Sequence, residues 1–482
     1  MKRSIRLSPM LLAVALSPAL LQMDDCDRGD TYLLSLQFEV GGQDLIQGFN
    51  ANNRSGYAVT TTGSTATLTV DTRMDDSTAT YQWKVGGTTI EAGLIGLGGG
   101  SVVLNIPPGQ STLFVGVRAV EGTAGGYWVD VDRTLEECDS EPIIRTTDDG
   151  VEFVRTPRGC FEHLPGFAYE LKTVEIDGLR QGYVDEGPAN APVVLLLHGQ
   201  PTWAFLYRKM IPILVDAGYR AVAMDHLGLG NSDKPIDIAD YSYLGHIDRL
   251  EKFINALGLH DITLFAQDWG SVIGLHVAGE NPDWFARIVI GDGTLPVVPE
   301  GVEPYPRVEN PDEIDPDLQF VFFQLTPPQQ VPFYDGCALL GGTGFDFGAW
   351  MEYSMKAEAF HPAEVVEAAT WFDIPNEDEA AYDAPFPSRI YMAGPRVFPS
   401  LVNELGGVNQ NAWASLKQFE KPFLTIWASN DPISIGSCAT QDRLINNIPG
   451  AEGLPHTRLP EASHFLQDDQ GAEIARRIVE LM

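Results

Sequence analysis

One carboxylate stands where a covalent nucleophile would be expected. The sequence AQDWG at 266–270 follows an apolar run at 262–265 and precedes a stretch of helical character. Small residues at both ends permit a tight strand-to-helix turn, which exposes the central side chain. A carboxylate is anionic at neutral pH and can displace a leaving group from saturated carbon directly, whereas a serine hydroxyl first needs a base. We predict that Asp268 is a nucleophile; the alternative is a helix cap.

A histidine near the end of the chain is the predicted base. Water must hydrolyse the ester formed on a carboxylate nucleophile, and a base is needed to activate that water. His464 lies in the sequence ASHFL at 462–466, just before the last helical stretch. The order nucleophile, acid, histidine is typical of a doubly wound hydrolase. His456, in a loop before a short strand, is the alternative.

Two aspartates could orient this histidine. Asp431 follows the apolar run 423–427, which is the usual position of the acid and is favoured. Asp292 follows the run 288–290, where some relatives of such enzymes carry the acid instead. Either residue could also be an ordinary turn residue.

Backbone donors are expected to face the nucleophile. Hydrolysis of the ester passes through a tetrahedral oxyanion, which backbone N–H groups can stabilise. The loop 198–203, with the sequence HGQPTW, follows the first core strand. We expect one N–H from Gln200 in this loop and a second from Trp269, the residue after the nucleophile. The alternative for the loop is a plain strand-to-helix connection.

The elements that must hold these residues form an alternating pattern from Thr173 onward. Continuous apolar runs, typical of buried parallel strands, alternate with amphipathic stretches such as 245–257. The runs are 193–197, 220–224, 262–265, 288–290 and 423–427. We predict a doubly wound, mostly parallel α/β sheet over 173–482. The Pro-rich, aromatic segment at about 295–400 interrupts the alternation and indicates an inserted helical cap.

The first part of the chain has a different pattern. Short alternating runs separated by Gly, Asn and Pro predict an all-β sandwich over 31–135, and the charged segment 136–172 is interpreted as a linker. Phe49, the strand 113–117 and the closing sequence YWVDVDR at 127–133 loosely resemble the cadherin-like β-sandwich modules of bacterial surface proteins. The resemblance implies a spacer or adhesion role with a possible cell-surface partner.

The N-terminus predicts export. Lys2, Arg3 and Arg6 precede an apolar run at 7–21, and the pattern of a signal peptide covers 1–25. Cleavage after Ala19 and a lipid anchor at Cys26 both remain open, so the protein could be periplasmic, secreted or lipid-anchored. The net charge of −35 argues against nucleic-acid partners.

The chain has five cysteines, and their spacing does not resemble a zinc site. Disulfide connectivity does not follow from sequence. One possible set of pairs is Cys138–Cys160 and Cys337–Cys438, which would leave Cys26 over. We expect no metal and no cofactor, because water is the only co-substrate that the chemistry above requires.

From about Leu179 to the C-terminus the sequence resembles the haloalkane dehalogenases. Five stretches carry the resemblance: HGQPTW at 198–203, LYRKMIP at 206–212, GLGNSDKP at 228–235, QDWG at 267–270 and AYDAPFP at 381–387. It implies a halide site made by the indole N–H groups of Trp269 and Trp350, since a tryptophan N–H is a donor only. Apolar side chains would line the pocket, namely Phe347, Phe386 and Pro387.

Two features depart from this family. Gln200 replaces the Glu that is common at its position, and the segment 297–345 is longer than in the family and rich in Pro and acidic residues. The resemblance implies hydrolysis of a halogenated hydrocarbon by water to an alcohol, with halide as the second product.

Two rival functions stay open. An epoxide hydrolase would use the same nucleophile, base and acid, and it would need cap tyrosines to protonate the epoxide oxygen. Four tyrosines are available for that role: Tyr334, Tyr353, Tyr382 and Tyr391. A rival of another class is a non-catalytic, surface-attached binding protein on a hydrolase scaffold.

Overall fold

The computed structural model describes residues 33–133, with short gaps between strands, and residues 138–482 except His163 and most of 319–344. The predicted signal peptide lies outside the described residues. The chain divides into two compact units, Met1–Glu136 and Glu137–Met482.

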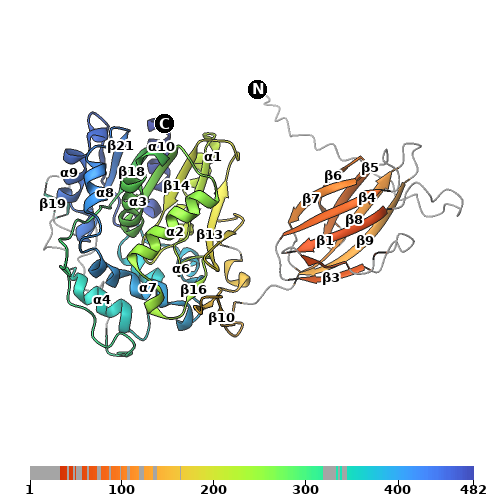
Figure 1. The fold of residues 1–482 in the computed structure, drawn as a ribbon, viewed down its shortest axis with the longest axis horizontal. Coiled ribbons are helices and arrows are strands. Elements are labelled where there is room, and N and C mark those ends of the chain that lie inside the picture. The colour runs from red at the N-terminus through yellow and green to blue at the C-terminus, as the bar shows by residue number, and fades with distance from the viewer. Residues whose placement is uncertain are drawn as a thin grey trace, which may run out of the picture. The chain divides into compact units, whose positions relative to one another are not determined.

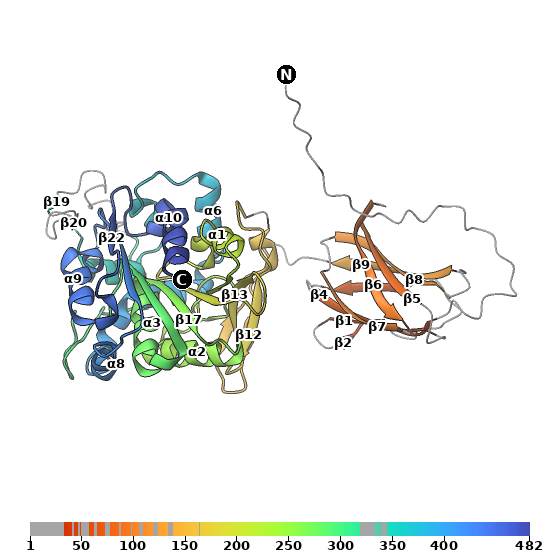
Figure 2. The ribbon, with the colours of Figure 1, turned by 90° about the horizontal axis from the view of Figure 1, so that it is seen from above.

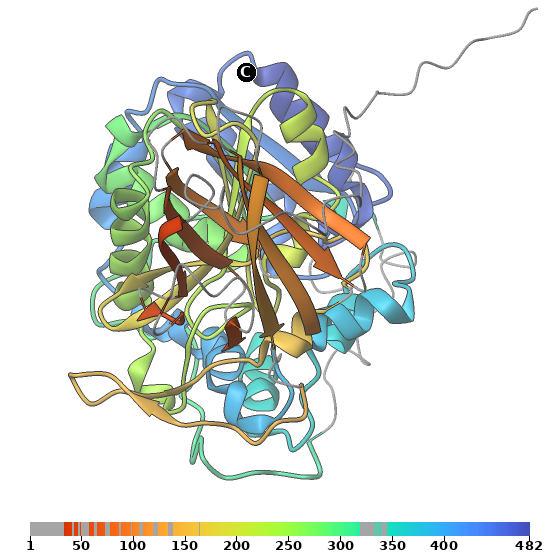
Figure 3. The same ribbon diagram turned by 90° about the vertical axis from the view of Figure 1, so that its right-hand side faces the viewer.

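The first unit consists of two β-sheets around one apolar core. Its strands are coloured red to orange in Figure 3, and their order is β2-β1-β4-β7 in one sheet and β3-β9-β8-β5-β6 in the other. Within β1, Leu36 and Phe38 are buried while Gln37 between them is exposed, which is the alternation of a half-buried strand. The bounds are β1 Leu33–Val40, β2 Gln43–Asp44, β3 Tyr57–Thr61, β4 Thr65–Thr72, β5 Thr78–Val85, β6 Thr88–Leu97, β7 Gly99–Asn105, β8 Gly109–Arg118 and β9 Ala124–Arg133.

The second unit is built on an eight-stranded sheet in the order β12-β13-β15-β14-β17-β18-β21-β22. The pairs β12–β13 and β13–β15 are antiparallel, and the remaining pairs are parallel. This arrangement confirms the predicted mostly parallel sheet. The bounds are β12 Lys172–Ile176, β13 Leu179–Glu186, β14 Val193–Leu197, β15 Arg220–Met224, β17 Ile262–Gln267, β18 Phe285–Gly291, β21 Phe423–Ala428 and β22 Thr457–Leu459.

The central strands are buried over their whole length. Every residue of β14, β17 and β21 is buried, which explains their continuous apolar sequences. Because neighbouring strands run in the same direction, their carboxyl ends meet at one edge of the sheet, and the residues that follow them come together there.

Helices cover both faces of this sheet (Figure 2). Helix α1 (Ile211–Asp216) packs against α10 (Leu466–Leu481), and α3 (Asp268–Glu280) packs against both α2 (Tyr243–Ala256) and α8 (Gln410–Leu416). A further helix, α9, spans Cys438–Asn447. Among the described residues, no helix has the length and apolar character needed to cross a membrane.

Short helices between β18 and β21 form the predicted cap. They lie at one end of the sheet's strands (Figure 1). Their bounds are α4 Phe347–Lys356, α5 Pro362–Ala368, α6 Asn376–Asp383 and α7 Ala393–Val397, and the 3-10 helix η9 at Phe398–Glu404 follows. Most of the long segment between β18 and α4 lies outside the described residues.

The segment 136–172 differs from its interpretation as a linker. It carries two short strands, β10 (Arg145–Thr146) and β11 (Glu152–Val154), and belongs to the second unit from Glu137 onward. Strand β11 pairs with β16 (Lys234–Pro235). Strands of two and three residues are too short to show an apolar pattern, so the charged residues around them resembled a linker.

A disulfide and an ion pair of Arg155 help to hold this segment. Cys138 and Cys160 form a disulfide, as in the first of the two possible pairs. Arg155 makes two hydrogen bonds to Asp233, at 2.8 and 3.1 Å. Cys438 is also disulfide-bonded, whereas the side chain of Cys337 lies outside the described residues.

Candidate active site

Asp268 sits in a strained, tightly packed turn between β17 and α3. Its φ angle of 49° lies in the left-handed region, which non-glycine residues rarely adopt. The turn requires close contacts on both sides. A Cβ on Gly270 would lie 2.2 Å from the carbonyl oxygen of Leu197, and a Cβ on Gly199 would lie 2.2 Å from Oδ1 of Asp268. Both positions therefore need glycine, and the turn presents the carboxylate to the loop after β14.

Two of the predicted partners face different oxygens of the Asp268 carboxylate. The backbone N–H of Gln200 donates to Oδ1 of Asp268 at 3.0 Å. Nε2 of His464 lies 3.6 Å from Oδ2 of the same carboxylate. The two oxygens therefore have different surroundings: one accepts from the backbone, and the other faces an imidazole.

Of the two candidate acids, Asp431 is the one that contacts His464. Its Oδ2 lies 2.8 Å from Nδ1 of His464, and both side chains are buried. Burial lowers the pKa of His464, but the carboxylates of Asp431 and Asp268 hold it well above its usual value. A hydrogen bond from Nδ1–H to Asp431 fixes the ring orientation and directs Nε2 towards Asp268.

Asp292 is close to this pair but is oriented differently. Its Oδ1 accepts a hydrogen bond from the backbone N–H of Ala428 at 2.9 Å, and its Oδ2 has no partner within the described part of the chain. Burial and the charge of Asp431 raise the pKa of Asp292 well above its usual range. Asp292 therefore takes up a proton more readily than an ordinary aspartate does.

Gln267 contacts the histidine directly, which the sequence did not indicate. Its Nε2 lies 3.0 Å from the carbonyl oxygen of His464 and 3.1 Å from the ring nitrogen Nε2. A carbonyl oxygen can only accept, so the amide nitrogen of Gln267 must face it. The sequence placed Gln267 in the QDWG motif, but no residue type could show that its amide reaches a histidine almost 200 positions later.

The side chain of Gln200 bridges to the cap. Its amide donates to the carbonyl oxygen of Pro395 in α7 at 2.8 Å, while its backbone N–H holds Asp268. The second expected backbone donor, the N–H of Trp269, stays a prediction.

The two predicted halide-binding tryptophans are both buried. Trp269, in the first turn of α3, packs against Phe398 with 5.7 Å between ring centroids. Trp350, in α4, packs against Tyr353 and Phe360 at 6.1 and 5.9 Å. These contacts do not join one indole to the other, so a shared halide site remains a prediction.

The predicted pocket residues have different surroundings. Phe347 is half-buried and packs against Tyr305, with 4.8 Å between ring centroids. Phe386 is buried, and the ammonium of Lys234 lies 5.7 Å from its ring centroid. Pro387 is exposed, which does not favour a place in the wall of an enclosed pocket.

The geometry predicts how the histidine titrates. Asp431→Asn should lower the pKa of the His464 imidazole by about 1 to 3, because a carboxylate in direct contact is lost. Asp292→Asn is the matched control and should change this pKa less, because the Asp292 carboxyl accepts from the Ala428 N–H and makes no hydrogen bond to the imidazole. NMR titration of the imidazole resonances measures both. An equal decrease in the His464 pKa in the two variants would contradict the assignment of Asp431 as the acid that holds this histidine.

The chain is similar to known proteins over its second unit. The model of the alpha/beta hydrolase fold matches residues 192–325. A haloalkane dehalogenase of Mycobacterium marinum is 38% identical over 340 residues, which cover 68% of this chain and 99% of that protein. A haloalkane dehalogenase of Psychrobacter cryohalolentis is 35% identical over 343 residues, or 69% of this chain and 98% of that protein.

A solved structure gives the same result. The structure of haloalkane dehalogenase DpaA from Paraglaciecola agarilytica has a TM-score of 0.53 and 27% identity, and the match covers 68% of this chain and 97% of that one. Taken with the eight-stranded sheet and the inserted cap, these similarities show that the chain belongs to the haloalkane dehalogenase family of α/β-hydrolases.

Proposed function

We propose that this protein hydrolyses carbon–halogen bonds of small halogenated hydrocarbons through an ester on Asp268. The observation that carries the proposal is the unequal environment of the two carboxylate oxygens. Oδ1 accepts a hydrogen bond from the Gln200 N–H, and Oδ2 faces Nε2 of His464, whose Nδ1 is held by Asp431. One oxygen is thus stabilised where negative charge develops, and the other is available for bond formation.

The first step is displacement at saturated carbon. Oδ2 of Asp268 forms a bond to the carbon while the carbon–halogen bond breaks, and the halide leaves with the bonding electron pair. No proton is transferred, so this step needs no base. We propose that the indole N–H groups of Trp269 and Trp350 stabilise the departing halide, because they donate without offering a competing nucleophile.

The second step is hydrolysis of the ester. His464 takes a proton from water through Nε2, and the hydroxide attacks Cγ of Asp268. The charge that develops on Oδ1 is stabilised by the Gln200 N–H and, as predicted, by that of Trp269. The tetrahedral intermediate collapses, the alcohol leaves with a proton from His464, and the resulting carboxylic acid of Asp268 releases its proton to restore the carboxylate. The products are alcohol, halide and one proton, with Asp431 stabilising the transient imidazolium.

Contacts of the cap tyrosines favour this reaction over epoxide hydrolysis. The hydroxyl of Tyr353 donates to the carbonyl oxygen of Ala359 at 3.2 Å, and that of Tyr382 donates to Asp468 at 2.5 Å. Both protons are committed to protein acceptors, whereas an epoxide hydrolase needs them for the substrate oxygen. The side chain of Tyr334 lies outside the described residues.

Halide release tests the function. The wild-type protein should release bromide continuously from 1,2-dibromoethane or 1-bromobutane, and Asp268→Ala should release none, because its side chain has no nucleophilic oxygen. Ion chromatography measures the bromide. Turnover of styrene oxide without bromide release would instead assign the protein to the epoxide hydrolases. Absence of turnover on both substrates would favour a binding protein.

Removing the base should separate the two steps. In His464→Ala the displacement still proceeds, so about one bromide per protein molecule should be released before the reaction stops. Mass spectrometry of the peptide that contains Asp268 should then find the alkyl ester. Continued turnover in this variant would show that another group activates water.

We further propose that the protein is exported and that its first unit is a cadherin-like β-sandwich acting as a spacer or adhesion module. The disulfide between Cys138 and Cys160 supports export, since disulfides persist in oxidising compartments. Expressed in a bacterial host, the mature chain should be found outside the cytoplasm without its first residues. Intact mass measures the loss, and Cys26→Ser distinguishes a lipid anchor from simple cleavage. A full-length chain in the cytoplasm would contradict the proposal.

A further inference from the structure

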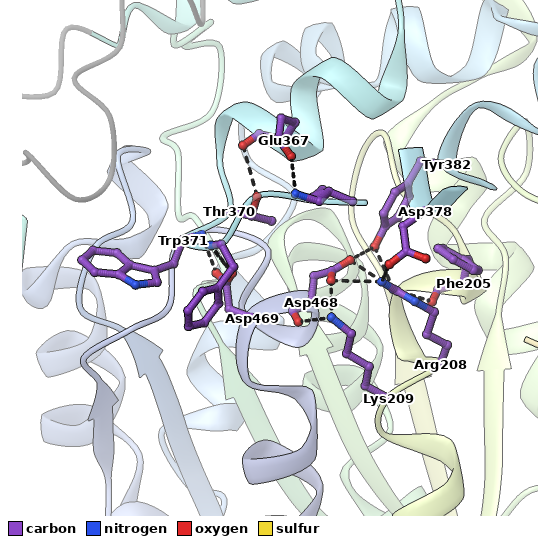
Figure 4. Close-up of polar contacts among 12 residues, drawn as sticks. Phe205, Arg208, Lys209, Glu367, Thr370, Trp371, Asp378, Tyr382, Asp468 and Asp469 are labelled. Atoms are coloured by element: carbon purple, nitrogen blue, oxygen red, sulfur yellow. Dashed lines mark hydrogen bonds and ion pairs between the residues drawn. The ribbon is translucent and has the colours of Figure 1, made fainter. Parts of the chain in front are cut away.

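Two adjacent carboxylates in the first turn of α10 hold the cap, and they do so in different ways (Figure 4). Asp468 accepts hydrogen bonds from Nη1 and Nη2 of Arg208, both at 3.0 Å, and from the hydroxyl of Tyr382 in α6. Asp469 instead accepts from backbone amides: from Trp371 at 2.9 Å, from Phe372 at 3.1 Å and from Ser463 at 2.9 Å. Asp468 thus links Tyr382 of α6 to Arg208, whereas Asp469 binds backbone N–H groups.

The amides that Asp469 binds come from two functionally distinct segments. Trp371 and Phe372 belong to the cap, between α5 and α6, whereas Ser463 immediately precedes His464. One carboxylate therefore joins a cap segment to the loop that carries the base.

A second contact joins the same cap segment to the other side of the base. The backbone N–H of Phe465, the residue after His464, donates to the carbonyl oxygen of Ala369 at 3.3 Å. Both neighbours of His464 in the chain are thus hydrogen-bonded to the segment 369–372, one directly and one through Asp469.

Asn430, the residue before Asp431, holds the other side of the loop that carries His464. The amide of Asn430 donates to the carbonyl oxygens of Pro460 and Ala462, and the Ser463 hydroxyl donates to the carbonyl oxygen of Asn430. These bonds fix the loop relative to Asp431. Asp469 supplies the matching restraint from the cap side, so the position of His464 depends on both.

Asp469 is ionised at pH 8, the pH of the experiment described below. Burial raises its pKa to about 6, with a contribution from Asp468, although the three amides act in the opposite direction. At pH 8 its carboxylate is ionised, and hydrogen bonds from N–H groups to a charged acceptor are stronger than those to a neutral one.

We propose that Asp469 is a positioning residue for His464, tying the base to the cap segment 369–372. The proposal rests on the two-step reaction above, because only hydrolysis of the ester uses His464. Misplacement of a catalytic group by about 1 Å can slow its step about 100-fold. Loss of Asp469 should therefore slow hydrolysis and leave displacement nearly unchanged.

Rapid-quench measurements with 1,2-dibromoethane at pH 8 separate the two rate constants. In Asp469→Ala, ester hydrolysis should be about 10- to 100-fold slower, displacement should be almost as fast as in the wild type, and alkylated protein should accumulate. Asp469→Asn keeps one carbonyl oxygen that can accept from the amides, so it should recover part of the hydrolysis rate. Glu473→Gln is the control on the same helix, where Glu473 forms partly exposed ion pairs with Arg476 and Arg477, and it should change neither rate constant.

A purely structural role for Asp469 gives a different result. It would lower the melting temperature and reduce both rate constants by the same factor, or reduce neither, and each of these outcomes would overturn the proposal. If Asp469→Ala does not fold, Asp469→Asn decides by the same ratio of rate constants. A wild-type protein that releases no halide would refute the proposed function itself, which this design distinguishes from a failure of the positioning role.

Discussion

The close approach of two chain segments, the β17–α3 turn at Asp268 and the loop after β14, is the constraint on which the site depends. The left-handed turn at Asp268 brings its carboxylate against Gly199, while Gly270 lets the start of α3 touch the end of β14. A left-handed non-glycine residue costs on the order of 1–3 kcal/mol, so the surrounding sheet must over-determine it. The fully buried strands β14 and β17 provide that rigidity, and the Gln200 N–H reaches Asp268 as a result.

The charges around this turn are divided between neighbouring groups. Asp268 and Asp431 raise the pKa of His464, whereas burial and the charge of Asp431 raise the pKa of Asp292. The Asp431 carboxylate acts on both groups, because its negative charge favours the protonated imidazole and disfavours an ionised Asp292. Proton uptake is thus favoured at both neighbours of Asp431, while Asp431 is the aspartate that bonds to the imidazole.

Sequence reasoning succeeded where a local pattern carries the information. Continuous apolar runs located the central strands, and the AQDWG motif located the turn. It left Asp431 and Asp292 open, because both follow neighbouring parallel strands and only the directions of their side chains separate them. It missed the role of Asp469, whose partners are main-chain amides and leave no trace in residue type.

The disulfide at the start of the second unit has a mechanical consequence. Cys138 is the second residue of that unit, and its bond to Cys160 closes a covalent ring around β10 and β11. Tension that enters along the chain from the first unit passes across the sulfur atoms to Cys160, so the segment inside the ring carries none of it. The small sheet that β11 forms with β16 is thereby shielded from pulling on the chain that precedes Cys138.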